Sequence, residues 1–249
     1  VLYEIIEDAA AKPIRRLSKG GSPTELSLSE RAKVAEFLST QMTRGESFKQ
    51  TTGDFVDEVS KVVMKMKIAH HGDSWADWTG EEGRAMTPEQ FGETIDNNRF
   101  KVVPSAEHLL QLRLAPVEEM AEIFVDFSWH CVRFEQPCLF TCGEPVTYWR
   151  EPTPATAFRG IGARTTDEVR IALSPRLALV LVHPRWRFRD SEVVGGRREA
   201  ALLNFGTLFF RPGFPIIRSP DVAHHPLPTA AFADSRMMPQ FNGGPIVRA

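Results

Sequence analysis

The sequence lacks the long apolar run that a membrane-spanning helix needs. Such a helix takes roughly 20 consecutive apolar residues, and the chain of 249 residues contains no such stretch. Its beginning, Val1-Leu2-Tyr3-Glu4, has neither the basic segment nor the apolar segment of a secretory signal peptide. We therefore expect neither a membrane protein nor a secreted protein, and predict a location in the cytoplasm.

Cysteine is scarce, and the number of cysteines is odd. Cys131, Cys138 and Cys142 are too few and too uneven for a disulfide framework. They form no Cys-x-x-Cys pair, so a zinc site that combines them with His130 is only an alternative. A catalytic thiol at Cys142 would need a cation such as His130 or Arg176 to lower its pKa. Reduced structural thiols are the expectation, with no metal and no cofactor.

Neither sign of charge is in large excess. The 30 basic and 32 acidic side chains leave a formal net charge of -2, whereas a non-specific nucleic-acid binder needs a basic surplus. The stretch Arg185-Trp186-Arg187-Phe188-Arg189 does interleave basic and aromatic residues, which can bind nucleic acid. It also fits an edge strand with a charged outer face. The edge strand is the preferred interpretation, and nucleic acid is an alternative partner that the net charge does not favour.

No motif in the chain specifies a reaction. No serine stands in a Gly-x-Ser-x-Gly elbow, and Gly160-Ile161-Gly162 is too short for a nucleotide-binding fingerprint. The segment from His70 to Trp78 contains His70, His71, Asp73 and Asp77. Their spacing fits no pattern of metal ligands, because adjacent side chains diverge on a regular backbone. An exposed insertion is predicted there rather than a metal site.

Helix-start signals are strong in the first half of the chain. Ser27-Leu28-Ser29-Glu30 is a capping box whose helix is expected to run to about Phe48. Thr87-Pro88-Glu89-Gln90 is a second start of this kind. Apolar periodicity and proline positions predict the remaining helices. These are Leu2–Leu17 with a kink or early end at Pro13, Thr51–Ile68, the segment after Ser105 with a break at Pro116, and Arg197–Phe210.

Two of these helices carry predictions about which side chains face inward. The Thr51–Ile68 helix has apolar residues at helical spacing, which are expected to face the core. They are Phe55, Val59, Val62 or Val63, and Met66. In the helix that starts at Ser27, Gln41 and Arg44 fall on the apolar face. A buried arginine has to be paired, so Arg44 is expected to bind a carboxylate such as Glu7, with an anionic ligand as the alternative.

Strand signals follow from Trp129 onward. Val169, Ile171 and Leu173 alternate with other residues at the period of a half-buried strand, and Leu177–Val182 is apolar throughout, as in a strand covered on both faces. Ser174-Pro175-Arg176 between them predicts a tight reversal. Further strands are expected at Trp129–Phe134 and at Phe140-Thr141. Because helices largely precede strands, we predict an α+β fold, with a helical N-terminal half packed on a small, mainly antiparallel C-terminal sheet.

The predicted boundaries follow from this order. We expect a single α+β domain over 1–218, helical over 1–127 and strand-rich over 128–218. The chain after Ser219 is rich in proline, histidine and glycine and low in periodicity. It is therefore expected to form an irregular tail over 219–249.

Several segments resemble an uncharacterised, mainly bacterial family, domain-of-unknown-function family 4238. They are Phe140-Thr141-Cys142-Gly143-Glu144-Pro145-Val146, the Leu173-Ser174-Pro175 turn, Gln41-Met42-Thr43-Arg44 and the Asn204 segment. The resemblance spans roughly Leu2 to Ile217. In the family an aspartate occupies the position of Gly143, and Glu144 is its candidate substitute. The family's N-terminal His-His-Tyr-x-Pro segment is missing here.

Polar residues within these segments form the candidate ligand-binding set. They are Arg44, Thr141, Glu144, Ser174, Arg176 and Asn204. One hypothesis is a binding or interaction protein with a cleft between helices and sheet. That cleft would take a small anionic ligand, a peptide or a protein partner, in a bacterial stress or phage response.

The second hypothesis is an enzyme that acts on nucleotides or phosphodiesters. In this hypothesis Arg44 and Glu144 or Glu7 supply the electrostatic and acid–base groups. The position of Arg44 discriminates between the two hypotheses. If Arg44 and Glu144 lie together at an open site, the enzyme is favoured, and if Arg44 is sealed against Glu7 the enzyme loses its best residue.

Overall fold

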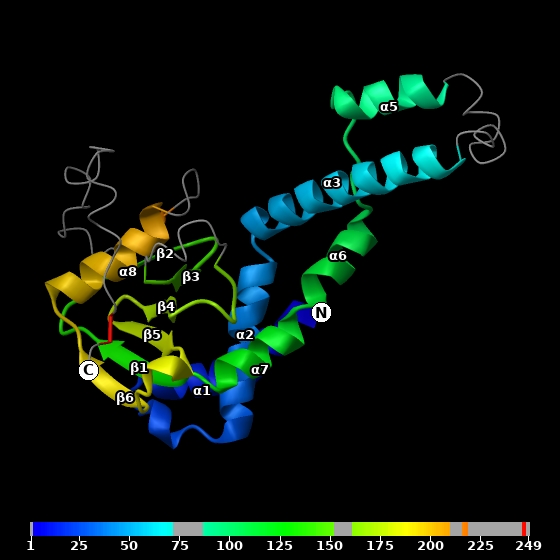
Figure 1. The fold of residues 1–249 in the computed structure, drawn as a ribbon. Helices are drawn as coiled ribbons and strands as arrows, with labels where there is room; N and C mark the ends of the chain where they lie inside the picture. The colour runs from blue at the N-terminus through cyan, green and yellow to red at the C-terminus, as the bar shows by residue number, and fades with distance from the viewer. Residues whose placement is uncertain (1, 72–86, 152–160, 210–215, 219–245, 248–249) are drawn as a thin grey trace. The chain divides into compact units, whose positions relative to one another are not determined.

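The apolar run Leu177–Val182 forms strand β5, at the middle of a five-stranded sheet (Figure 1). The structure is a computed structural model, and the residues it describes are 2–71, 87–151, 161–209, 216–218 and 246–247. The chain divides into two units, one of residues 1–45 and 116–249 and the other of residues 46–115. The sheet belongs to the first unit. The single domain expected over 1–218 stays a prediction.

The main sheet has the strand order β3-β4-β5-β1-β6. The strands that join β5 in it are β1 (Ser128–Arg133), β3 (Val146–Trp149), β4 (Glu168–Ser174) and β6 (Ser191–Val194). Neighbours pair antiparallel except β1 and β6, which are parallel. The predicted α+β fold with a mainly antiparallel sheet is confirmed, and the parallel edge pair makes the sheet mixed. The reversal predicted between β4 and β5 is confirmed as well.

Phe140-Thr141 lies in a strand, as predicted, but this strand does not join the main sheet. It is β2 (Phe140–Cys142), which pairs antiparallel with β7 (Ile216–Arg218) in a separate two-stranded sheet. Just before it, the N–H groups of Cys138 and Leu139 both donate to the carbonyl of Pro175, at 2.8 and 3.1 Å. These bonds hold the chain across the β4–β5 turn instead of along a strand of the main sheet.

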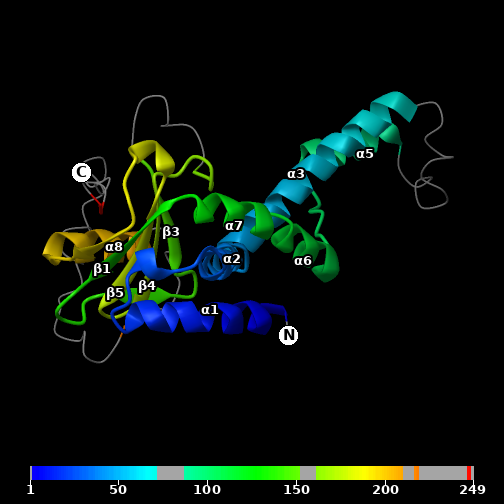
Figure 2. The same ribbon diagram turned by 90° about the horizontal axis from the view of Figure 1, so that it is seen from below.

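Helices cover both faces of the main sheet (Figure 1). One face carries three of them: α1 (Leu2–Ser18), α2 (Leu28–Thr43) and α7 (Val117–Val125). In Figure 2, α2 is seen nearly along its axis, between α1 and α7. The other face carries α8 (Arg197–Phe209), whose Leu203 belongs to the same core as Val180 and Ile246.

Strand β5 is buried along its whole length because it contributes to both cores. Leu177, Leu179 and Leu181 belong to the core under α1, α2 and α7, together with Phe124 and Trp129. The three β5 residues that alternate with these leucines belong to the core under α8. This is the period of two that a strand imposes, and the prediction of a strand covered on both faces is confirmed.

The helices of the first unit begin where the sequence indicates, but two of their ends differ from the prediction. Ser27 caps α2 in a capping box with Glu30, as expected. The helix ends at Thr43 rather than near Phe48, because Gly45 breaks it. A Cβ at Gly45 would lie 2.7 Å from the Glu144 side chain, so the close approach needs glycine there.

Helix α1 continues through Pro13 to Ser18, so of the kink or early end expected at Pro13 the early end was wrong, and the kink stays a prediction. Proline removes one helical hydrogen bond. The ring of Pro13 is buried, however, and burial of its apolar surface offsets that loss.

The second unit contains α3 (Glu46–His71), α5 (Pro88–Asp96) and α6 (Ala106–Leu114). Thr87 caps α5 in the predicted capping box. Lys61 on α3 is buried and binds Asp57, one turn earlier, at 2.8 Å. Its ammonium group also binds Asn98 and lies 5.4 Å from the centre of the Phe100 ring. The packed face of α3 therefore includes a charged pair that is fully partnered.

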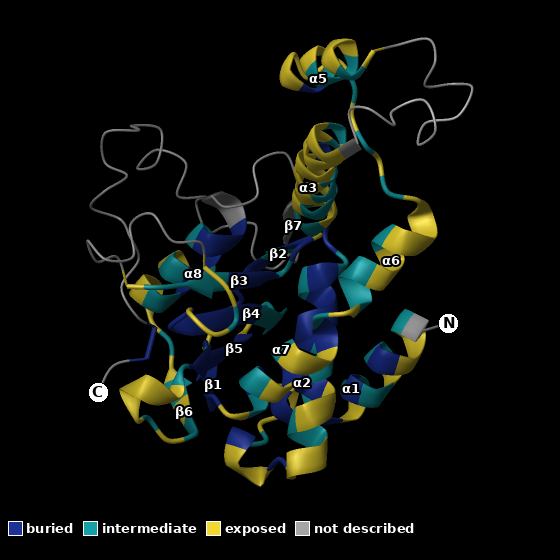
Figure 3. Cartoon of the chain, turned by 45° about the vertical axis from the view of Figure 1, so that its right-hand side comes forward, coloured by how far each residue is buried: buried dark blue, intermediate teal, exposed yellow. Residues whose placement is uncertain are grey.

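The prediction that Phe55, Val59, Val62 or Val63, and Met66 face inward was wrong, since all of them are exposed (Figure 3). The physical reason lies on the other side of α3. Asp57 and Lys61 find their partners in the segment after α5, so that side is the one that packs within the unit.

Three predicted segments fall wholly or partly outside the described residues. The His70–Trp78 segment is described only as far as His71, which lies in the last turn of α3. The loop expected around Gly160 lacks residues 152–160. Of the tail expected over 219–249, Ile246 and Val247 are described, and both are buried in the core under α8. Among the helices in the described ranges, none is both long and apolar enough to cross a membrane.

Candidate functional site

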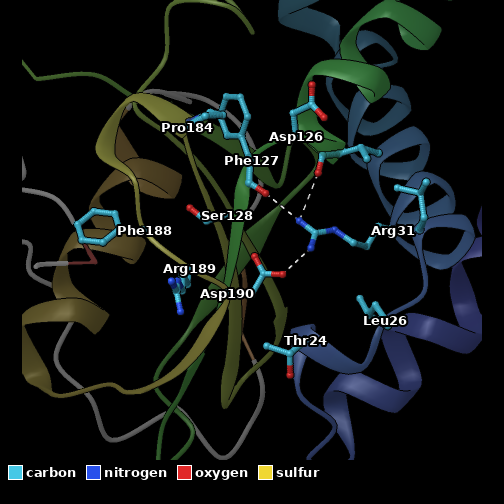
Figure 4. Close-up of a pocket in the computed structure, with 12 residues that line it drawn as sticks. Thr24, Leu26, Arg31, Asp126, Phe127, Ser128, Pro184, Phe188, Arg189 and Asp190 are labelled. Carbon is cyan, nitrogen blue, oxygen red and sulfur yellow. Dashed lines mark hydrogen bonds and ion pairs between the residues drawn. The ribbon is translucent and has the colours of Figure 1, made fainter.

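A pocket of about 770 Å³ lies in the first unit, where α2 and the end of α7 meet the start of β1 and the segment before β6 (Figure 4). Half of its twelve lining residues are apolar, and these come from several parts of the chain. These are Leu26, Leu28, Val125, Phe127, Pro184 and Phe188. The pocket thus lies between helices and the main sheet, and the cleft expected from the sequence stays a prediction.

Arg31 and Asp190 form an ion pair on the wall of the pocket, and Figure 4 shows the two side chains pointing toward one another. Arg31 also donates to the carbonyl of Phe127 at 2.8 Å and to that of Val125 at 3.3 Å. Its guanidinium lies 4.9 Å from the centre of the Trp129 ring. Asp190 accepts the N–H of Trp129 at 2.7 Å. The pair thus joins α2, the end of α7, β1 and the segment before β6.

Two further charged side chains line the pocket, Asp126 and Arg189. Both are exposed, and neither side chain has a partner within the described part of the chain. The positive charge of Arg31 is offset by Asp190. Arg189 and Asp126 are therefore the two lining charges that no described residue neutralises.

Local backbone features bring the segment before β6 to the pocket. Pro184–Trp186 forms the short 3-10 helix η3, and Arg187 then adopts a left-handed conformation with φ of 54°. Few residues other than glycine take this conformation, and here it reverses the direction of the chain. Phe188, Arg189 and Asp190 follow this turn and supply one wall.

The prediction that Arg185-Trp186-Arg187-Phe188-Arg189 forms an edge strand was wrong. Asp167 is buried, and its carboxylate accepts bonds from the Arg185 guanidinium and, at 2.5 Å, from Trp186 Nε1. A buried carboxylate has to be partnered, and these bonds hold the two residues in a turn. The edge strands of the main sheet are β3 and β6 instead.

Two of the six predicted ligand-binding residues, Arg44 and Glu144, lie near the end of α2. Arg44 ends this helix and forms an ion pair with Glu7, which confirms that pairing. The two side chains are 36% and 42% exposed, so Glu7 holds Arg44 without sealing it from solvent. Glu144 is buried and packs against Gly45, the residue after Arg44. Thr141 is half-buried in β2.

The other three predicted residues gather around the β4–β5 turn. Ser174 Oγ accepts the N–H of Arg176 at 3.2 Å, and Arg176 itself is exposed. Asn204 on α8 is buried, accepts the N–H of Phe140 at 2.9 Å and donates to the carbonyl of Cys138 at 2.7 Å. Its amide thus fastens α8 to the start of β2. None of the six residues lines the pocket, and as a ligand-binding set they stay a prediction.

All three cysteines are buried, and none of them forms a disulfide. Cys131 and Cys138 belong to the cores on opposite faces of the main sheet. Burial raises the pKa of each of these two thiols to about 11, which disfavours the reactive thiolate. Within the described ranges, no group of three or more His, Cys, Asp and Glu residues is placed to hold a metal ion.

His130 on β1 is a buried titratable group close to the pocket. Its Nδ1 lies 2.8 Å from Ser191 Oγ, and its Nε2 has no hydrogen-bond partner in the described structure. Burial lowers the pKa of the imidazole to about 4, and the charge of Asp190 acts against this shift.

This shift predicts a pH dependence of stability. The ordinary pKa is 6.5, so below this pH the unfolded chain takes up a proton that folded His130 does not. The contribution of neutral His130 is fully present above about pH 6.5 and is lost as the pH falls toward 4, by up to about 3 kcal/mol. Urea unfolding of Ser191→Ala should keep this slope between pH 4.5 and 7.5. His130→Leu/Ser191→Ala should flatten it, and equal slopes for the two variants would refute the assignment.

Sequence reasoning missed Arg31 and Asp190, which lie 159 residues apart. One local signal was available. Arg31 is a cation in the first turn of a capped helix, where the helix dipole disfavours positive charge. Such a residue requires a partner, but nothing in the sequence says that Asp190 is the one.

A family model described as "Protein of unknown function (DUF4238)" matches residues 2–243 of the chain. No curated protein and no solved structure matches it. The match includes the Phe140–Val146 and Leu173-Ser174-Pro175 segments that carry the resemblance in the sequence. The chain therefore belongs to the DUF4238 family of proteins of unknown function.

Proposed function

We propose that this protein is a binding protein whose pocket between α2, α7 and the main sheet takes a small organic anion with an apolar body. One observation carries the proposal: the pocket combines apolar side chains with the guanidinium of Arg189, which has no partner among the described residues. Its volume of about 770 Å³ suits a small molecule, for which pockets of about 300–1,000 Å³ are usual.

The apolar body of the ligand follows from the walls. Phe188 supplies aromatic surface and Leu28, the first residue of α2, supplies aliphatic surface, whereas Leu26 and Phe127 are buried and add little. Leu28 is 71% exposed, so a ligand in the pocket would remove apolar surface from water. Such burial contributes about 25 cal/mol for each Å².

The single negative charge proposed for the ligand follows from Arg189 and Asp126, which have no partner among the described residues. A guanidinium binds a carboxylate, sulfonate or phosphate through paired N–H donors. Arg31 is already neutralised by Asp190, which leaves Arg189 to make that contact. Asp126 disfavours further negative charge in the same pocket. A monoanion therefore fits better than a nucleotide, and Arg44, on which the enzyme hypothesis depends, is already paired with Glu7.

A pair of fluorescent probes tests the proposal. 8-Anilinonaphthalene-1-sulfonate is an apolar monoanion, and N-phenyl-1-naphthylamine has a similar apolar body without the charge. We expect Arg189→Ala to weaken binding of the anionic probe about tenfold, because one charge-assisted contact is lost. Binding of the neutral probe should not change. Fluorescence titration gives both dissociation constants.

Arg197→Ala is the matched control, since Arg197 is an exposed arginine of the same unit that does not line the pocket. It should leave the binding of both probes unchanged. The proposal fails if the two variants weaken the anionic probe equally, or if the unaltered protein shows no saturable binding of it. Native mass spectrometry of the purified protein would then identify any anion that co-purifies.

The proposal retains the predicted setting in the cytoplasm and in a bacterial stress or phage response. The buried cysteines, none of which forms a disulfide, support a reducing compartment. A small anionic ligand was predicted from the sequence, and the pocket supports this class of ligand more than a peptide or a protein partner.

A further inference from the structure

The second unit exposes an apolar stripe along α3. Its residues are Phe55, Val59, Val62 and Met66, with exposed fractions of 67%, 43%, 54% and 65%. Figure 3 shows this part of α3 mostly in the colour of exposed residues. Apolar side chains grouped in this way on a surface are typical of an interaction site.

The spacing of the stripe is that of a helix pair. Its four residues follow one another at steps of four, three and four, which is the alternation of a and d positions in a coiled coil. The opposite side of α3, with Asp57 and Lys61, packs within the unit. The stripe is therefore available to a second helix. With 26 residues, α3 is about 39 Å long, long enough to pair over several turns.

The charges beside the stripe indicate which helix fits it. Glu58 and Lys65 lie one heptad apart on the same side of the stripe, each directly before an a-position residue. In an antiparallel pair, these flanking positions of the two helices face each other. Glu58 of one α3 would then lie opposite Lys65 of a second α3, and two-fold symmetry makes this contact twice. A parallel pair would instead place both residues beside Val63 and His70, without an opposite charge.

We propose that two copies of this protein associate through antiparallel pairing of their α3 helices. The seam between the two helices would be formed by the apolar stripes of both copies. Val56 and Val63 extend each stripe on the side away from Glu58. The ion pair that Lys65 makes with Asp96 is exposed, with side chains 49% and 64% accessible. Exposed pairs contribute little, so Lys65 can change partner at small cost. This inference is independent of the pocket in the first unit.

Sedimentation equilibrium of the full chain tests the pairing. We expect a dimer for the unaltered protein and about a hundredfold weaker association for Val62→Glu, which places a charge in the apolar seam. Val103→Glu is the matched control, because Val103 is 76% exposed in the same unit and lies off the stripe. It should remain dimeric. Both valines are exposed, so circular dichroism should show that both variants fold.

Charge reversal tests the antiparallel register. Glu58→Lys should weaken the dimer about tenfold by placing two lysines opposite each other. Adding Lys65→Glu should restore it, because the opposite charges then meet again. The proposal is overturned if the unaltered protein is monomeric at about 100 μM, if Val62→Glu dimerises as well as Val103→Glu, or if the double reversal fails to restore the dimer.

Discussion

Arg170→Met is expected to lower the free energy of unfolding by about 3–5 kcal/mol at neutral pH, the largest effect that we predict for one side chain. Arg170 and Glu168 lie on the same side of β4, and their side chains are 5% and 1% exposed. Arg170 Nε donates to the Glu168 carboxylate at 2.7 Å, and the guanidinium lies 5.2 Å from the centre of the Trp149 ring. The substitution leaves a buried carboxylate without its cation.

The loss of unfolding free energy caused by Arg170→Met should depend on pH. Burial raises the pKa of the Glu168 carboxyl, and Arg170 and the N–H groups of Ile246 and Val247 act against that rise. Without Arg170 the pKa rises further, so Glu168 becomes neutral in mild acid and its burial is less unfavourable. Denaturant unfolding should therefore show a smaller loss at pH 5 than at pH 8. Glu168→Gln/Arg170→Met should recover much of the stability, because glutamine still accepts the Ile246 N–H without a charge.

Two results would count against this explanation. One is an equal loss for Arg170→Met at pH 5 and pH 8. The other is a double variant that is no more stable than the single one. Either result would mean that the packing of Arg170, and not the uncompensated charge of Glu168, sets the effect.

Arg31→Met is expected to lower the free energy of unfolding by about 2–3 kcal/mol and to weaken binding in the pocket. The Arg31 and Asp190 side chains are only 16% and 19% exposed. Methionine keeps much of the contact with Trp129 but donates no hydrogen bond. Asp190 would lose its cation, and the carbonyls of Val125 and Phe127 would lose a donor.

A second arginine of the same unit provides the control. Arg164 forms an ion pair with Glu119 on α7, with side chains 71% and 62% exposed. Arg164→Met should cause no measurable change, because solvent screens such a pair. If the Arg31 and Arg164 variants unfold at the same denaturant concentration, the Arg31–Asp190 pair does not hold the helices on the sheet. Adding Asp190→Asn to Arg31→Met should return part of the stability, since the two residues interact directly.

The parts of the fold that the sequence predicts correctly are those set by local patterns. The capping boxes at Ser27 and Thr87 satisfy backbone N–H groups within a few residues, so they place helix starts without knowledge of the rest of the chain. The uninterrupted apolar run Leu177–Val182 predicts a strand covered on both faces for the same reason. The turn at Ser174-Pro175-Arg176 follows from the fixed φ of proline.

The parts that were missed depend on contacts between distant residues. The apolar stripe on α3 indicates that this side of the helix will be covered. It does not show whether the same chain or a second copy covers it. The Asp57–Lys61 side packs within the unit only because Asn98 and Phe100 meet it there. The end of α2 before Gly45 depends on the Glu144 side chain, which packs against this glycine. Helix propensities describe local sequence and cannot predict such a distant contact.

The pocket was missed for a similar reason. The candidate set from the sequence came from family-like segments, and Asn204 in that set fastens α8 to the start of β2. The residues that line the pocket lie outside the family-like segments, and Phe188 and Arg189 belong to a stretch for which an edge strand was predicted. Phe188 and Arg189 reach it through the turn at Arg187 and the bonds of Arg185 and Trp186 to Asp167, which become evident only in three dimensions.

Backbone chemical-shift mapping with 8-anilinonaphthalene-1-sulfonate is the most direct test of the central claim, that a small organic anion binds between α2, α7 and the main sheet. The predicted result is a saturable set of shifts centred on Leu28, Phe127 and Arg189. Shifts centred instead on Thr141 and Glu144, or shifts that do not saturate, would contradict it.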